Sequence, residues 1–163
     1  QAHHRRRHRS RVMPRLLRPG QPRDMTACGE IIAAASRASV IHERIPGLRS
    51  LFEDSRPLDS EGRRRLVAEQ SGRVAGFADF DPENGHIRYL FVDPARQGAG
   101  IGAALVDAIQ DICGGRISVN CFAVNDVSLA WYLRRGFEVE KGWIDPDWHG
   151  MEVVWLGLVR RRA

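Results

Sequence analysis

A glycine-rich turn near residue 100 limits the folds open to this chain more than any other feature. The stretch "PARQGAGIGAAL", residues 94–105, follows a strand-like run and opens a helix-like one. Glycine has no side chain to cover the main chain, so such a turn leaves the amides at the amino end of the helix open to a bound anion. We therefore expect a phosphate-bearing ligand between a strand and a helix of an α/β domain.

Two phosphate ligands fit the spacing. Gly98, Gly100 and Ala103 match the G-x-G-x-x-G/A turn of dinucleotide-binding proteins, whereas Gln97, Gly100 and Gly102 match a Q-x-x-G-x-G loop for the diphosphate of coenzyme A. A dinucleotide turn follows its strand at once, and an acidic residue about 20 positions later binds the ribose. Here several residues separate the strand from the first glycine, and the next strand ends without an acid. The flanking sequence favours coenzyme A.

The hydrophobic periodicity predicts strands and helices that alternate in the order of a mixed sheet with helices on both faces. The expected strands cover 15–18, 63–70, 73–80, 86–93, 116–124, 137–145 and 149–159, the last two around a loop at 146–148. The expected helices cover 24–37 (with Asp24 as N-cap), 46–54, 101–113 and 128–137.

Charge and cysteine content exclude several classes of protein. Residues 1–12 hold five arginines and no acid, which accounts for the whole formal net charge of +5. They are interpreted as a disordered basic leader or a vector remnant, and residues 13–163 as a single domain. Nucleic acid is therefore not expected as a partner, and no run approaches the roughly twenty apolar residues of a membrane span. The three cysteines lack C-x-x-C spacing, which favours free thiols in a reducing cytoplasm and no metal site.

Two motifs in order resemble those of the GCN5-related N-acetyltransferase superfamily. The stretch "LFVDPARQGAGIGAAL" is similar to the family's V-x-P-x-x-Q-x-x-G-x-G motif through Val92, Pro94, Gln97, Gly100 and Gly102. The stretch "NDVSLAWYLRRGF" is similar to N-x-x-A-x-x-F-Y-x-x-x-G-F through Asn125, Tyr132, Gly136 and Phe137, with Ser128 replacing Ala and Trp131 replacing Phe. The order of the elements extends the resemblance to residues 13–159.

The resemblance implies an enzyme that moves an acetyl group from acetyl-CoA to a primary amine, of a small molecule or a peptide, by direct transfer in a ternary complex. It implies a mostly antiparallel sheet of six to seven strands that is splayed between strands 86–93 and 116–124. Acetyl-CoA is the expected co-substrate, no metal is required, and a homodimer is compatible with the family. The alternative is a non-catalytic acyl-CoA-binding or regulatory module of the same fold.

The resemblance also assigns the donor site. The main chain of Leu90, Phe91 and Val92 would pair with the pantetheine, with the Leu90 N–H donating to the thioester oxygen. Asn125 and Ser128 would contact the cofactor at the start of the second motif. The phosphate loop would contribute Arg96, Gln97, Gly98, Ala99, Gly100, Ile101 and Gly102.

Within the second motif, Tyr132 is the expected general acid, which would give its phenolic proton to the departing thiolate. His86 and Glu83 are candidate bases, with Asp79 as a further carboxylate. Strand alternation predicts that His86 shares a face with Leu90 and Val92.

The acceptor pocket is expected between the helices at 24–37 and 46–54 and the loop at 145–150. Its candidate side chains are Trp143, Asp147, Trp148 and His149.

Overall fold

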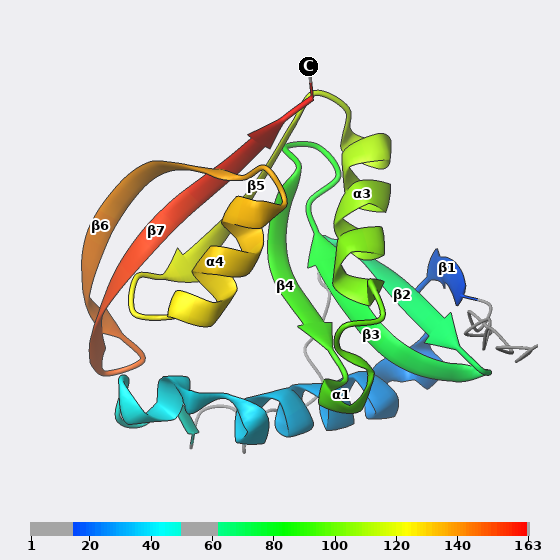
Figure 1. The fold of residues 1–163 in the computed structure, drawn as a ribbon, viewed down its shortest axis with the longest axis horizontal. Helices are drawn as coiled ribbons and strands as arrows, with labels where there is room; N and C mark the ends of the chain where they lie inside the picture. Colours follow the sequence, from blue (N-terminus) through cyan, green and yellow to red (C-terminus); the bar gives the residue numbers. More distant parts are fainter. Residues whose placement is uncertain (1–14, 50–61, 163) are drawn as a thin grey trace, which may run out of the picture.

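The structure, a computed structural model, describes residues 15–49 and 62–162. Within these ranges, seven strands form one sheet in the order β1-β2-β3-β4-β5-β7-β6 (Figure 1). Neighbouring strands are antiparallel except for β4 and β5, which are parallel. The strands are β1 (Arg15–Pro19), β2 (Arg64–Gln70), β3 (Arg73–Phe80), β4 (His86–Val92), β5 (Arg116–Phe122), β6 (Glu138–Trp148) and β7 (Met151–Arg161). The mostly antiparallel mixed sheet that we predicted is confirmed.

Helices cover both faces of the sheet, as predicted. The α-helices are α1 (Met25–Ala38), α3 (Ile101–Cys113) and α4 (Asp126–Arg134), and the 3-10 turns are η1 (Pro22–Asp24), η2 (Val40–Glu43) and η3 (Pro94–Arg96). Helices α3 and α4 pack on one face, and α1 packs on the other. No helix of the described ranges combines the length and the apolar character that crossing a membrane would require.

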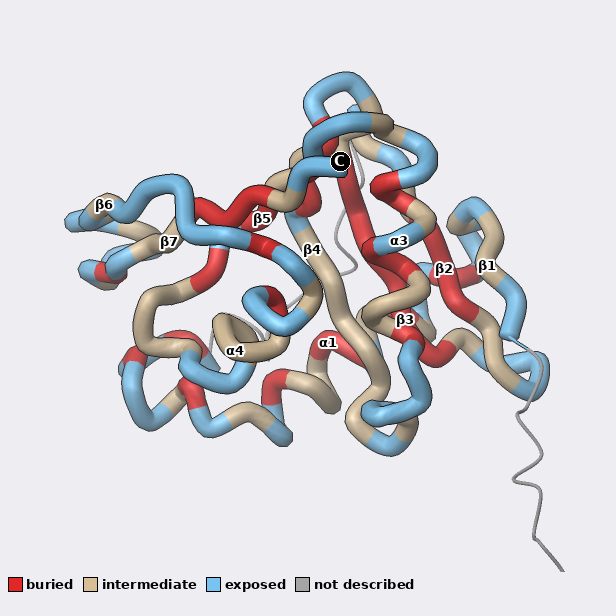
Figure 2. The backbone as a smooth tube through the Cα atoms, turned by 45° about the horizontal axis from the view of Figure 1, so that its top comes forward, coloured by how far each residue is buried: buried red, intermediate tan, exposed pale blue. Residues whose placement is uncertain are grey.

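Apolar spacing explains why α3 lies where it does. Ile101, Leu105 and Ile109 recur every four residues, which places them on one stripe, and all three are buried against the sheet. Gly114 then ends the helix with a positive φ of 82°. Figure 2 shows that buried residues run along β2, β3 and β5, whereas β6 at the sheet edge is largely exposed. The core therefore lies under α3, next to the parallel pair of strands.

Asp24 occupies the N-cap position of α1, as predicted, but its side chain does not cap the helix. Asp24 already has helical backbone angles (φ −82°, ψ −11°) and makes no side-chain cap to α1. Its carboxylate instead accepts hydrogen bonds from Arg18 at 2.8 Å and from the Gln21 N–H at 2.7 Å. The preceding 3-10 turn moves the chain into the helical region early, so this buried acid joins β1 to α1.

Two boundaries near the C-terminal end also differ. Strand β6 continues through the expected loop to Trp148, and the hairpin turns at His149 and Gly150, which both have positive φ. Helix α4 covers 126–134 rather than 128–137. Residues 50–54 of the helix expected at 46–54, and the leader at 1–12, lie outside the described residues.

Candidate active site

The parallel strands β4 and β5 separate along their length. They pair at only two positions, His86 with Ser118 and Ile87 with Val119, and then diverge (Figure 1). The predicted splay is therefore present in the sheet. Paired strands satisfy each other's amides and carbonyls, so the divergence leaves one side of β4 open to an added extended partner.

The register with β3 decides which groups of β4 face this opening. Alternate residues of an antiparallel strand turn their main-chain groups to the same neighbour. The Asp93 N–H donates to the Ala75 carbonyl at 2.8 Å. The main-chain N–H and C=O groups of Asp93, Phe91 and Tyr89 therefore point towards β3. The amide and carbonyl groups of Leu90 and Val92 consequently face β5. This orientation agrees with the role predicted for the Leu90 N–H.

A β-bulge at Arg88 changes the face of every earlier side chain in β4. Phe80 pairs with Ile87, but Asp79 pairs with Tyr89, so β4 has one extra residue, Arg88, between two pairs that are consecutive on β3. Ile87 lies in the core cluster under α3, whereas Tyr89 packs on the α1 side. Without a bulge these two residues would share a face.

The bulge corrects our prediction for His86. Because His86 alternates with Ile87, it lies on the α1 side, whereas Leu90 and Val92 pack on the α3 side. The predicted shared face is therefore wrong. The His86 Nδ1 is 2.9 Å from the Ser118 hydroxyl, at the closed end of the splay. Burial, and then the charge of Arg88, lower the pKa of His86 below its ordinary value.

The other two candidate bases, Glu83 and Asp79, are carboxylates that contact other parts of the chain. Glu83 is exposed in the β3–β4 turn, where its N–H donates to the Asp81 side chain. Asp79 is fully buried and accepts two hydrogen bonds from Arg65 at 2.7 and 2.8 Å. Asp79 pairs with Tyr89 and shares its face with Phe77 on the α1 side, whereas the Leu90 side chain packs on the α3 side.

The glycine turn has the backbone geometry that an anion site needs. Gly98 and Gly100 have φ of 84° and 77°, in the left-handed region that favours glycine. A Cβ on Gly98 would meet no atom within 4 Å, so the surface there is open. Gly100 is the N-cap of α3, and the first amides of that helix have no intrahelical acceptor. Residues 97–100 are exposed.

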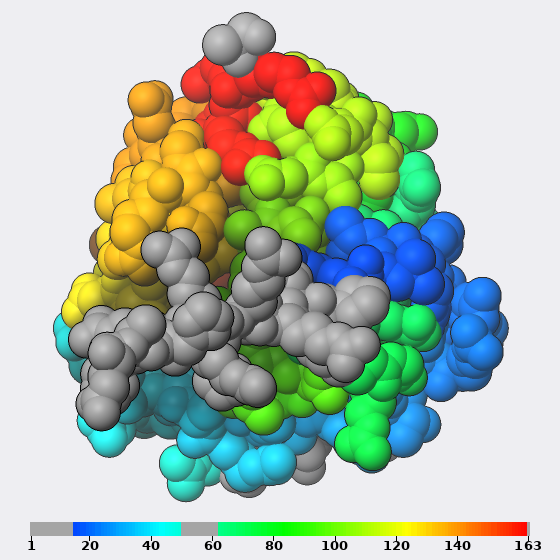
Figure 3. Space-filling view, turned by 45° about the vertical axis from the view of Figure 1, so that its right-hand side comes forward, coloured from blue at the N-terminus to red at the C-terminus, as the bar shows by residue number. Residues whose placement is uncertain are grey.

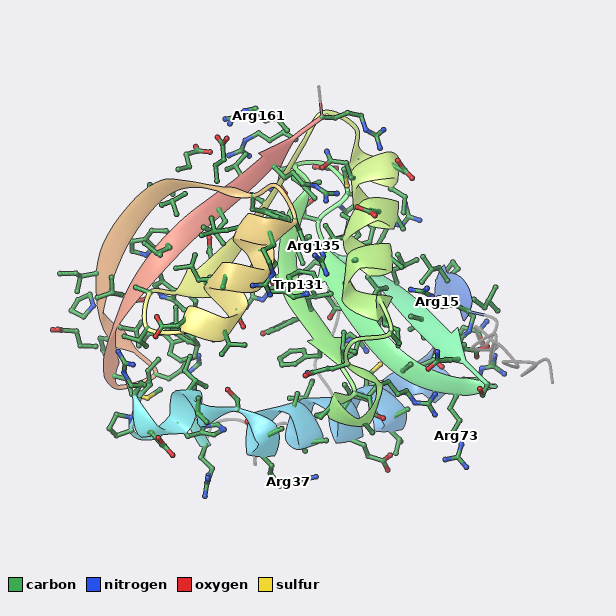
Figure 4. All side chains as sticks on the ribbon, in the orientation of Figure 1. Arg15, Arg37, Arg73, Trp131, Arg135 and Arg161 are labelled. Atoms are coloured by element: carbon green, nitrogen blue, oxygen red, sulfur yellow. The ribbon has the colours of Figure 1, made fainter. Side chains whose placement is uncertain are left out.

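Gly102 has a further structural reason to be glycine. A Cβ there would lie 3.0 Å from the Trp131 ring, so its small size lets α4 pack against the first turn of α3. Figure 4 shows Trp131 and Arg135 on the side of α4 that faces α3. The guanidinium of Arg135 lies 5.0 Å from the centre of the Trp131 ring.

Arg96, which we expected at the loop, contacts two other side chains in the structure. Its Nη1 donates to the Gln70 side chain at 3.1 Å, and its Nε lies 3.8 Å from the Asp93 carboxylate. The side chain lines a groove of about 780 Å³ between α1 and the ends of β2 and β3. Arg96 is thus engaged beside α1, on the face opposite α3.

Arg15 is the cation that we missed. It belongs to β1, and its Nη1 donates to the Gly100 carbonyl at 2.6 Å across 85 positions of sequence. Only the pairing of β1 with β2 brings it there, so neither motif contains a signal for it.

Tyr132 is held in the core on the α3 side of the splay. Its side chain is 9% exposed and makes edge contacts with Trp131 and Phe137, with ring centres 5.2 and 5.3 Å apart. Burial, and then the nearby Cys121, raise its pKa well above the ordinary value. The hydroxyl therefore keeps its proton throughout the neutral range.

Asn125 positions Tyr132 through the backbone. Its Oδ1 accepts the Ser128 N–H at 3.2 Å, which makes Asn125 the N-cap of α4. Tyr132 follows seven residues later, two turns along the same face of the helix. The cap leaves the two amide hydrogens of Asn125 for other partners.

The expected acceptor region contains a cluster of aromatic side chains. Trp155 stacks on Phe122 at 4.1 Å and on Trp143 at 6.4 Å, and Trp148 meets Phe122 edge-on at 5.2 Å. The Asp147 side chain accepts the Gly150 N–H and so stabilises the hairpin turn. Trp143 and Trp148 therefore have packing roles whatever they bind.

Metal ligands are not grouped in the described ranges. No three His, Cys, Asp or Glu side chains among residues 15–49 and 62–162 lie close enough to hold a metal ion.

Comparisons with known proteins agree with this geometry. The model of a family described as "Acetyltransferase (GNAT) family" matches residues 31–137. A GCN5-related N-acetyltransferase from Rhodopseudomonas palustris superposes with a TM-score of 0.72 at 21% identity, over 92% of this chain and 98% of that one. The yncA protein of Salmonella typhimurium, solved with its cofactor acetyl-CoA, gives 0.63 at 20%, over 90% and 93%. The ribosomal-protein-S18-alanine N-acetyltransferase of Escherichia coli gives 0.60 at 18%, over 91% and 94%.

Proposed function

Because this chain belongs to the acetyltransferase (GNAT) family, we propose that it transfers an acetyl group from acetyl-CoA to a primary amine, directly, in a ternary complex. The observation that carries the proposal is the combination of a splayed β4–β5 pair with a glycine loop at the start of α3. An extended pantetheine and a diphosphate are the two parts of one donor that such neighbouring sites would hold.

The described residues fit coenzyme A at both ends. The left-handed Gly98 and Gly100 let main-chain amides approach an anion that a Cβ would keep away. The amides and carbonyls of Leu90 and Val92 face the opening, where they would pair with the amides of an extended chain. The side chains of Leu90 and Val92 pack against the apolar core on the α3 side, which shields that face of β4 from water.

The bound donor would supply an activated acyl group as a thioester. The Leu90 N–H would donate to the thioester oxygen and so stabilise the negative charge that develops there. As the bond from the amine nitrogen to the acyl carbon forms, the bond from carbon to sulfur breaks. As the carbon–sulfur bond breaks, Tyr132 would give its phenolic proton to the sulfur, and it would recover one from the solvent.

The pKa of Tyr132 sets a limit on this proton transfer. A phenol near ~10 is a weaker acid than a thiol near ~8.5, so transfer to a thiolate costs about 2 kcal/mol, and burial increases that cost. The transfer becomes favourable overall because the attacking nitrogen loses a proton as the amide forms. Tyr132 therefore acts together with nitrogen deprotonation and not after a free thiolate has been released.

We assign the amine proton to solvent and not to a side chain. Asp79 is bound to Arg65, and His86 and Glu83 lie at the closed end of the splay. The amine would enter in its neutral form, which is scarce at pH 7 for an alkyl amine of pKa near ~10.4. The rate should accordingly rise with pH in the range where the amine titrates.

The test is release of free thiol from acetyl-CoA with a panel of amines and peptides. We expect Tyr132→Phe to lower kcat by about 100-fold or more while the affinity for CoA stays within two-fold. Tyr89→Phe is the matched control, because Tyr89 is the only other tyrosine and lies on the α1 side. Equal rates for Tyr132→Phe and the unmodified protein would remove Tyr132 from its role.

The same assay separates the alternative of a non-catalytic acyl-CoA-binding module. The positions of His86, Glu83 and Asp79, none of which was assigned as the base, favour that alternative. It predicts CoA binding without thiol release for any amine.

We keep the cytoplasm as the expected location, because Cys28, Cys113 and Cys121 are all free thiols.

A further inference from the structure

The side chain of Arg15 lies at the phosphate loop, although Arg15 belongs to β1, an edge strand of the sheet that is three strands away from β4. Strand alternation places Arg15 on the same face as Leu17, which packs against the core under α3. Figure 3 shows the blue residues of β1 beside the green residues at the start of the α3 region, and Figure 4 shows Arg15 beside the lower end of α3. The Nη1 of Arg15 donates to the Gly100 carbonyl at 2.6 Å.

The contact with Gly100 uses only part of the guanidinium. Arginine has five N–H donors in a planar fork, and one of them is occupied by the carbonyl. Its Nη2 lies 3.8 Å from the position where a Cβ of Gly100 would stand, so a second nitrogen also borders the loop. Among residues 15–49 and 62–162, the Gly100 carbonyl is the one acceptor that this guanidinium contacts.

Electrostatics make this position unfavourable unless an anion is present. The amino end of a helix carries partial positive charge, so a cation there is repelled. The first turn of α3 has no acidic residue, and no carboxylate of the described residues pairs with Arg15. The Arg15 guanidinium and the partly positive amino end of α3 thus lie close together at Gly100, whose carbonyl accepts the hydrogen bond from Arg15.

We propose that Arg15 is a ligand of the donor's diphosphate, which it binds together with the amides of the glycine loop. The inference rests on the proposed function, because it assigns a residue to the same donor site. A charged fork beside main-chain donors is the arrangement that recognises phosphate oxygens. Arg15 would take the place that the sequence assigned to Arg96, whose Nη1 donates to Gln70 and whose Nε lies 3.8 Å from the Asp93 carboxylate.

The experiment is calorimetric titration of CoA and of 3′-dephospho-CoA into the full chain and its variants. Arg15→Met should weaken both ligands by about 10-fold to 100-fold, as expected when a hydrogen bond to a charged group is lost. Arg15→Lys should fall between, because it keeps the charge but not the fork. Arg73→Met is the control for net charge, since Arg73 is exposed at the same end of the sheet. It should change the affinity less than two-fold.

The salt dependence of CoA binding separates a charge contact of Arg15 from a purely structural role, because a structural role would leave it unchanged. Raising the NaCl concentration should weaken binding to the unmodified protein more than to Arg15→Met, because the variant lacks the screened contact. Thermal unfolding of each variant checks that the fold is retained.

Each outcome decides between the claims. If Arg15→Met and Arg73→Met bind CoA alike, Arg15 is only a tether of Gly100 and the inference is overturned. If Arg15→Met loses affinity for CoA but not for dephospho-CoA, Arg15 binds the 3′-phosphate and the diphosphate assignment is wrong. If the unmodified protein binds neither ligand, the proposed function itself fails.

Discussion

Replacement of Gly98 by alanine separates backbone strain from loss of an anion site. Gly98 has φ of 84°, and a Cβ there would meet nothing within 4 Å, so the variant suffers no steric clash within the chain. The cost to folding is conformational, about 1–2 kcal/mol for an L-residue in the left-handed region. A methyl group would also stand where the diphosphate approaches the loop amides.

Gly72 offers a matched control. It has φ of 74° in the β2–β3 turn, and a Cβ there is likewise free of contacts. Gly72→Ala and Gly98→Ala should therefore lose similar free energies of unfolding in urea titrations. Only Gly98→Ala should weaken CoA binding, by about 10-fold to 100-fold if one charged hydrogen bond of roughly 1.5–3 kcal/mol is lost. Calorimetry with CoA measures the difference. Equal affinities for the two variants would refute the assignment of the loop as the phosphate site.

Three further predictions concern residues around this site. Asn125→Ala should lower the free energy of unfolding by about 1 kcal/mol in urea, because the N-cap of α4 is lost, and Asn125→Asp should restore most of it; no change for the alanine variant would exclude the cap. Asp79→Ala should cost about 3–5 kcal/mol, since it removes the carboxylate that accepts two hydrogen bonds from Arg65; a loss below about 1 kcal/mol would show that the pair is not needed. The folded pKa of His86 is lowered, so its contribution to stability is present above the ordinary value near ~6.5 and is lost as the pH falls through the folded pKa. His86→Gln should flatten the thermal stability profile between about pH 7 and pH 5, and an unchanged slope would contradict the burial of a neutral imidazole.

The sequence predicted the features that depend on local spacing. The apolar repeat from Ile101 to Ile109 and the glycine pair at 114–115 defined α3, and the turn at Ser71 and Gly72 defined the β2–β3 hairpin. The glycine loop was predicted as an exposed turn at the start of a helix, and the structure adds that Gly98 and Gly100 have positive φ, which few other residues tolerate. These elements follow from short-range geometry that a single sequence contains.

Features that depend on strand register were not visible. The bulge at Arg88 inserts one residue into the alternation of β4, and no local pattern in "HIRYLFV" marks it. His86 was consequently expected on the wrong face. Arg15 was missed for a related reason, since only long-range pairing brings β1 beside the loop.

Competition between partners explains the remaining differences. Asp24 has the residue type of an N-cap, but Arg18 and the Gln21 N–H engage its carboxylate first. Arg96 directly precedes Gln97 of the motif, but Gln70 is within reach on the other side. In both cases a polar side chain had two possible partners, and the fold decided between them.

A crystal structure of the protein with coenzyme A tests the central claim most directly. We predict that the diphosphate lies on the main-chain amides between Gly98 and Gly102, with the pantetheine between β4 and β5. The sulfur should then lie within hydrogen-bond distance of the Tyr132 hydroxyl, and an acyl oxygen on that sulfur should reach the Leu90 N–H. Coenzyme A bound in the groove beside α1, or bound with its sulfur away from Tyr132, would contradict the account.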